Sequence, residues 1–136
     1  MIISEKIPSC LQLIPEFIAA LIEKIRPFSI EKDFNIKLCL EEALINAIRH
    51  GNKLDPDLFV NVTIKIDNSC LIIKVVDQGQ GFDFGSISDP TEPGHLKKPS
   101  GRGIFLIKNL MDEVDFFDCG RGIKMVKFFK SKGGGK

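Results

Sequence analysis

The chain has 136 residues, with 19 Lys and Arg against 18 Asp and Glu, and its formal net charge at pH 7 is +1. The content of 43% hydrophobic and 27% charged residues is typical of one folded domain. The balanced charge gives no sign of a surface for nucleic acid or for an anionic membrane, and we expect neither partner. No apolar run approaches the ~18 residues of a membrane span, and the N-terminus does not resemble a secretion signal, so we expect a cytoplasmic protein.

The cysteines are widely spaced and form no C-x-x-C pair. Only two histidines could complete a zinc site, His50 and His95. We therefore expect four reduced thiols that serve as small apolar residues, namely Cys10, Cys39, Cys70 and Cys119.

Two helices are predicted in the first 51 residues. Apolar residues recur at helical spacing before Pro27, and this helix begins either at a capping box formed by Ser9 and Gln12 or at Pro15. The second helix spans about residues 34–50, with Gly51 as its C-terminal cap. Its apolar stripe consists of Ile36, Leu40, Ala43, Leu44, Ala47 and Ile48.

Strands and a third helix are predicted in the rest of the chain. Alternation over 60–66 indicates a half-buried strand, and the β-branched run 71–76 indicates a more central one that ends at Asp77. A long loop, rich in Pro and Gly, leads to a helix over about 103–111. Two closing strands follow over 113–117 and 123–130, hinged at residues 119–122.

These elements predict an α+β sandwich, with an antiparallel or mixed sheet covered by helices on one face. We expect one domain over residues 1–130 and a flexible tail over 131–136. The order of the elements does not alternate strand and helix throughout, which weighs against a doubly wound nucleotide fold.

The second helix carries a polar group beside its apolar stripe. Glu42 and Asn46 are four residues apart and therefore lie one above the other, with Arg49 and His50 one turn further along. A carboxylate and an amide at this spacing could accept a proton and coordinate Mg²⁺ through oxygen. The alternative is a solvated helix flank in which Arg49 pairs with Glu42.

Two glycine-rich segments provide further candidates. Asp77-Gln78-Gly79-Gln80-Gly81-Phe82 follows the central strand, where glycines let a ligand approach the backbone and Asp77 can accept a hydrogen bond from an amine. Gly101-Arg102-Gly103-Ile104 leads into the third helix, whose first turn can bind phosphate. A plain turn and a flexible helix entry are the alternatives, and neither segment completes a P-loop or a Rossmann motif.

In order and spacing, the three segments resemble the GHKL superfamily of ATP-binding domains, which includes gyrase-type topoisomerases, a heat-shock chaperone, histidine kinases and a mismatch-repair ATPase. The N box is matched by Glu42-x-x-x-Asn46-Ala47-x-x-His50-Gly51. The two glycine boxes are matched by Asp77-x-Gly79-x-Gly81-Phe82 and by Gly101-x-Gly103-Ile104-x-Leu106. Within the superfamily, the chain is similar to the small anti-sigma-factor serine kinases of bacterial stress and sporulation switches.

This resemblance implies the histidine kinase-like (Bergerat) fold and a role for each matched residue. Asn46 would hold Mg²⁺ at the ATP phosphates, and Glu42 would be the catalytic base. Asp77 would accept the adenine amino group, with Gly79, Gly81 and Phe82 close to the base and ribose. The remaining nucleotide-binding candidates are Arg49, His50, Gly101, Arg102, Gly103 and Ile104, and the loop 83–100 would cover the phosphates.

The resemblance also implies a function. The chain would be an ATP-dependent serine/threonine kinase and anti-sigma factor, which phosphorylates a STAS-type anti-anti-sigma protein and binds a sigma factor in a partner-switching system. Relatives of this kind are often homodimers, although no feature of the sequence identifies a dimer interface. The alternative is an ATP-binding regulatory module that holds or releases a partner and transfers no phosphate.

Overall fold

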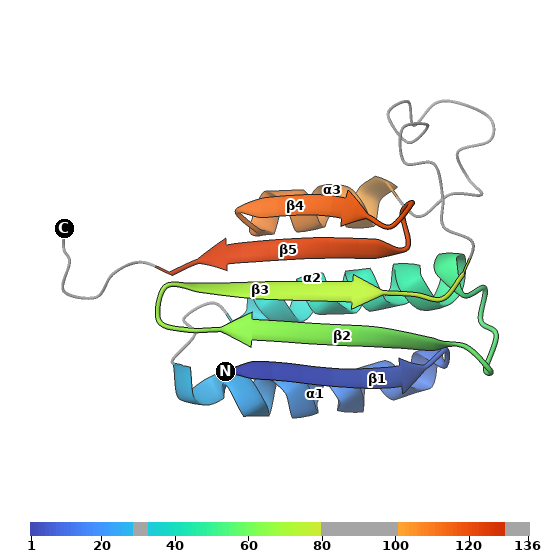
Figure 1. Ribbon diagram of the computed structural model, residues 1–136, viewed down its shortest axis with the longest axis horizontal. Coiled ribbons are helices and arrows are strands. Elements are labelled where there is room, and N and C mark those ends of the chain that lie inside the picture. The colour runs from blue at the N-terminus through green and yellow to red at the C-terminus, as the bar shows by residue number, and fades with distance from the viewer. Residues whose placement is uncertain (29–32, 80–100, 130–136) are drawn as a thin grey trace.

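The part of the chain that the structure describes forms an antiparallel five-stranded sheet with its helices on one face (Figure 1). This computed structural model describes residues 1–28, 33–79 and 101–129. The strand order is β1-β2-β3-β5-β4, and every neighbouring pair is antiparallel. The predicted two-layer α+β sandwich is therefore confirmed, and the sheet is wholly antiparallel rather than mixed. Within the described ranges, no helix is both long and apolar enough to cross a membrane.

The predicted strands are present, and the structure adds one at the N-terminus. They are β2 (Phe59–Ile66), β3 (Cys70–Val76), β4 (Glu113–Phe117) and β5 (Gly122–Phe128). The central position predicted for the run 71–76 is confirmed, because β3 is the middle strand of the sheet. The unpredicted strand is β1 (Ile2–Pro8), an edge strand whose buried side chains are only Ile3 and Ile7. So few apolar positions produce no clear alternation.

The first helix begins at the later of the two predicted positions. A short 3₁₀ turn, η1 (Leu11–Leu13), precedes α1 (Ile14–Ile25), and Pro15 lies in the first turn of α1. The capping box at Ser9 and Gln12 was wrong, because the Ser9 hydroxyl donates to the Leu58 carbonyl at 2.8 Å instead. A second 3₁₀ turn, η2 (Arg26–Phe28), follows α1.

The second helix changes its hydrogen bonding before it ends. Helix α2 (Asp33–Ile45) continues as a wider π-helical turn, η3 (Asn46–Gly51), in which the Asn52 N–H donates to the Ala47 carbonyl at 2.8 Å. The cap is therefore Asn52 and not Gly51 as predicted. Such π-helical segments are rare and are frequent at functional sites.

The third helix, α3 (Gly101–Leu110), begins earlier than predicted and includes both glycines of the motif in its first turn. The hydrophobic core lies between the three helices and the sheet. All six residues of the stripe predicted on the second helix are buried there, as are the alternate residues Val60, Val62, Ile64 and Ile66 of β2. The four cysteines are free thiols.

Four chain segments meet at one end of the strands of the sheet. As Figure 1 shows, the end of β3, the turn between β4 and β5, the end of α2 and the start of α3 all lie at the same end of the molecule. Contacts between α2 and α3 hold the two helices side by side. The N box, the described part of the first glycine box (Asp77 to Gly79) and the second glycine box therefore reach one place, although they are far apart in the sequence.

Asn52 connects the segments at this end of the sheet through a network of hydrogen bonds. Its amide nitrogen donates to the Ser9 hydroxyl at 2.8 Å and to the Phe59 carbonyl at 3.1 Å, and its amide oxygen accepts the Gln78 N–H at 2.8 Å. Only 2% of Asn52 is exposed. The residue thus joins the helix end to the ends of three neighbouring strands, and it fixes the backbone that follows Asp77.

Replacing this amide is expected to be costly. In Asn52→Ala, the buried Ser9 hydroxyl and the part-buried Phe59 carbonyl and Gln78 N–H lose a partner, and an unsatisfied buried group costs about 1–3 kcal/mol. We expect urea denaturation to show a free energy of unfolding lowered by at least about 2 kcal/mol. The matched control is Asn61→Ala, an exposed position of β2, which should change stability by less than about 0.5 kcal/mol. Equal stability of the two variants would contradict this role.

Candidate functional site

A cavity opens at the end of the sheet where the four segments meet. Five apolar residues form part of its lining, namely Ala43, Ala47, Val75, Phe116 and Ile123. The other lining residues are Asn46, Gly51, Asp77, Ile104, Gly120, Arg121 and Gly122. The structure therefore brings together candidates from all three predicted motifs, with Asn46 from the helix, Asp77 from the strand end and Ile104 from the start of α3.

Asp77 is the buried carboxylate of this cavity. It directly follows β3 and is 6% exposed, and its Oδ1 accepts the Gly79 N–H at 2.8 Å. Burial raises the pKa of Asp77 above its ordinary value of 3.8, while the Gly79 hydrogen bond and the positive charge of Arg121 oppose this shift. A partly desolvated acceptor that lines a cavity is suited to recognise a hydrogen-bond donor on a ligand.

The helix end and the strand end touch through glycine. A Cβ atom on Gly51 would overlap the Asp77 carboxylate, and a Cβ atom on Gly79 would overlap the Gly51 carbonyl. No other residue can occupy these two positions without moving buried groups. The close approach explains why glycines are needed here better than the capping role predicted for Gly51.

Glu42 and Asn46 lie beneath the first turn of α3. A Cβ atom on Gly103 would lie 2.7 Å from Glu42 Oε1 and 3.6 Å from Asn46 Nδ2. Both side chains therefore face α3, as their spacing of four residues predicts. Asn46 also lines the cavity, whereas Glu42 lies beside it and is half-buried.

Two other candidates from the second helix lie outside the lining of the cavity. Arg49 is exposed, and His50 is half-buried. Burial, with a smaller contribution from the charge of Arg49, lowers the pKa of His50, so its imidazole is neutral at pH 7. Contact of either side chain with a nucleotide stays a prediction.

Some predicted site residues cannot be placed. Outside the described residues lie Gly81, Phe82, the loop 83–100 with His95, and the tail 131–136. Gly101 and Arg102 belong to the first turn of α3, but their side-chain surroundings are not described. The roles of these residues in phosphate binding remain predictions.

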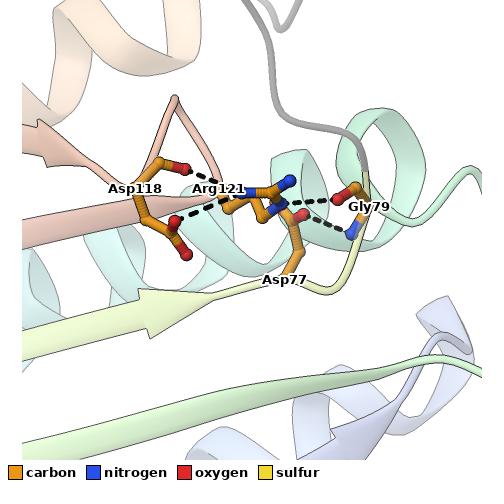
Figure 2. Close-up of polar contacts among 4 residues, drawn as sticks. All are labelled: Asp77, Gly79, Asp118 and Arg121. Atoms are coloured by element: carbon orange, nitrogen blue, oxygen red, sulfur yellow. Dashed lines mark hydrogen bonds and ion pairs between the residues drawn. The ribbon is translucent and has the colours of Figure 1, made fainter.

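Two residues of the site were missed by the sequence analysis. Asn52 follows a helix and precedes a polar turn, where asparagine is common and indicates no special role. It is buried only because three strands pack around it. Arg121 lies in the predicted hinge 119–122, but its side chain reaches the Asp77–Gly79 turn (Figure 2). The order of β3 and β5 in the sheet brings them together, and the sequence does not specify that order.

The arrangement is suited to bind a flat base and a phosphate chain. The apolar lining and glycine backbone can hold a base against Asp77, while the N-terminus of α3 offers the positive end of a helix dipole. In the described ranges, no three His, Cys, Asp or Glu side chains cluster to bind a metal by themselves. Mg²⁺ commonly binds through one or two protein oxygens and the phosphates of its ligand, so the Asn46 amide oxygen fits such a role.

Known proteins match over most of the chain. The family of the histidine kinase-like ATPase domain matches residues 8–128. The serine-protein kinase RsbW of Listeria monocytogenes is 30% identical over 112 residues, which cover 77% of this chain and 71% of that protein. The serine-protein kinase RsbW of Staphylococcus epidermidis is 31% identical over 105 residues, which cover 71% of this chain and 65% of that protein.

The buried charge of Asp77 should lower stability at neutral pH. Because burial raises its pKa in the folded protein, the ionised form disfavours folding at pH 7, and Asp77→Asn is expected to raise the melting temperature. The gain should shrink as the pH falls through the raised pKa towards 3.8, because wild-type Asp77 then becomes neutral in the folded state too.

Melting curves from pH 7 to pH 4 measure this effect. The matched control is Asp115→Asn, which removes the same charge from an exposed position of β4 and should leave the melting temperature nearly unchanged. A lower melting temperature of Asp77→Asn at pH 7 would show that the carboxylate contributes to stability instead.

Proposed function

Because the chain belongs to the family of histidine kinase-like ATPase domains, we propose that it binds ATP in this cavity and transfers the γ-phosphate to a protein serine or threonine. The observation that supports this most is the buried Asp77 carboxylate, which lies against the backbones of Gly51 and Gly79 and lines a cavity together with Asn46. This carboxylate is a hydrogen-bond acceptor in a cavity that suits a flat base.

Asp77 would select adenine. The amino group at C6 of adenine is a hydrogen-bond donor, and an ionised carboxylate can only accept. Guanine carries a carbonyl oxygen at that position, so its approach would place two acceptors together in a partly desolvated site. Rejection of this kind is strong, because a buried polar group is then left without a partner.

Asn46 and the first turn of α3 would hold the phosphates. Gly103 lets the helix backbone approach Glu42 and Asn46 closely, so the N-terminus of α3 lies next to the Asn46 amide. When bound with ATP, Mg²⁺ would neutralise part of the phosphate charge. The protein's part in phosphoryl transfer is then mainly positioning and charge stabilisation.

Glu42 would be the catalytic base. Its carboxylate lies one helical turn before Asn46 and next to Gly103, beside the place proposed for the terminal phosphate. A carboxylate there can accept the proton of a serine or threonine hydroxyl as it attacks. The name of the matched relatives, serine-protein kinase, is consistent with a protein acceptor.

The family resemblance suggests the partners. We propose a STAS-type anti-anti-sigma protein as the phosphate acceptor and a sigma factor as the protein that is bound and inhibited, in a cytoplasmic partner-switching system. A nucleotide-binding module that switches partners without phosphate transfer is the second candidate. Both functions need the same ATP site, and they differ only in whether Glu42 acts on an acceptor hydroxyl.

Nucleotide binding can be tested by calorimetric titration with ATP and with GTP in the presence of Mg²⁺. We expect ATP to bind and GTP to bind more weakly by at least about tenfold, because of the acceptor at C6 of guanine. Asp77→Asn should weaken ATP binding by about 1–3 kcal/mol. The absence of ATP binding by the folded wild type would contradict the proposed function in both its forms.

Phosphate transfer can be tested with γ-labelled ATP and STAS-domain proteins from the same organism. Glu42→Gln should abolish labelling of the acceptor while ATP still binds, and Asn46→Ala should abolish Mg²⁺-dependent labelling while the fold is retained. Lys24→Ala is a control, because Lys24 pairs with Glu5 on the surface. Undiminished labelling by Asn46→Ala would contradict the site, and ATP binding without labelling of any acceptor would favour the switching module.

A further inference from the structure

The turn between β4 and β5 has an unusual backbone. Asp118, Cys119 and Gly120 all have positive φ, at 55°, 56° and 85°. For the two residues with side chains, this left-handed conformation is unfavourable by on the order of 1 kcal/mol or more and persists only where the surroundings enforce it. The tight turn places the next residue, Arg121, at the end of β3.

Arg121 binds the Asp77–Gly79 turn through both its backbone and its side chain. Its carbonyl accepts the Asp77 N–H at 3.0 Å, and its Nε donates to the Gly79 carbonyl at 2.7 Å. Asp77 Oδ1 in turn accepts the Gly79 N–H at 2.8 Å. The three residues therefore form a closed set of hydrogen bonds, and Figure 2 shows the two that involve Gly79.

Asp118 orients the guanidinium from its other side. The Arg121 Nη1 atom lies 3.2 Å from Asp118 Oδ1 and 3.4 Å from the Asp118 carbonyl oxygen. Arg121 also lines the cavity beside Asp77. An ion pair of this kind, with both side chains one-third exposed or more, adds little to stability. Its consequence is geometric, since it limits where Nε can point.

We propose that Arg121 is a positioning residue of the nucleotide site, which holds the Asp77–Gly79 turn so that the carboxylate faces the amino group of adenine, and that Asp118 orients Arg121 for this role. The inference rests on the proposed ATP site and deepens it. The Arg121 side chain contacts the Gly79 carbonyl through Nε, so it acts on the turn rather than on the Asp77 carboxylate that would bind the base.

Base-selective loss of affinity distinguishes positioning from a general structural role. Inosine triphosphate has the ribose and phosphates of ATP but a carbonyl in place of the C6 amino group. Calorimetry with Mg²⁺ should show ATP affinity lowered about tenfold in Arg121→Ala, the size of one lost hydrogen bond. Affinity for inosine triphosphate should change by less than about twofold. Arg26→Ala removes an arginine of a similar surface pair on η2, at the opposite end of the sheet from the β4–β5 turn (Figure 1), and should change neither affinity.

A double-mutant cycle adds a second readout. In the Asp77→Asn background, Arg121→Ala should have less than about a twofold further effect on ATP binding, because the carboxylate that it positions is already gone. Additive effects, equal losses for both nucleotides, or no loss would each overturn the proposal. Wild type that fails to bind ATP would instead overturn the proposed function itself.

A milder variant keeps the test decisive if Arg121→Ala does not fold. Asp118→Asn removes the ion pair but retains Arg121 and a residue that tolerates positive φ. We expect it to weaken ATP binding about threefold and to leave binding of inosine triphosphate unchanged. Unchanged ATP binding by a folded Asp118→Asn variant would overturn the part assigned to Asp118, and with it the proposed orientation of Arg121.

Discussion

The contact between the end of the second helix and the end of the central strand is the constraint on which the site depends. At this point the Gly51 carbonyl lies against Gly79, and the Gly51 backbone lies against the Asp77 carboxylate. A side chain on either glycine would separate the helix from the strand. Because Asn46 and Glu42 belong to the helix and Asp77 to the strand, their separation would divide the two halves of the proposed nucleotide site.

Polar side chains maintain this contact from two sides. On one side, Asn52 links the helix end to Ser9, Phe59 and Gln78. On the other side, Arg121 holds the Gly79 carbonyl from the β4–β5 turn. Both are polar groups whose partners are supplied by distant parts of the chain, which is expected where a backbone must be held in one position. The apolar core supports the sheet and helices. These polar contacts determine the geometry at the end of the sheet where the proposed site lies.

Much of the fold could be predicted from periodicity. The stripe on the second helix and the alternation along β2 reflect burial on one face, and the family resemblance and the α+β sandwich are both confirmed. The errors lie where local patterns compete. The Ser9 hydroxyl binds a distant strand instead of capping a helix, and β1 has too few buried residues to be seen.

The site was predicted as three separate motifs, and the structure unites them. Asn46, Asp77 and Ile104 line one cavity, and Glu42 and Gly103 lie beside it. Asn52 and Arg121 could not be found from the sequence, because their importance arises from the strand order and from contacts across more than 20 residues. Motifs report which residues meet a ligand, whereas positioning residues become visible only in the folded arrangement.

The most direct test of the central claim is a crystal structure of the full chain with Mg²⁺ and a non-hydrolysable ATP analogue. The account predicts that the adenine amino group lies within hydrogen-bond distance of the Asp77 carboxylate, with the phosphates beside Asn46 and the first turn of α3. An analogue bound elsewhere on the protein, or an adenine without contact to Asp77, would contradict it.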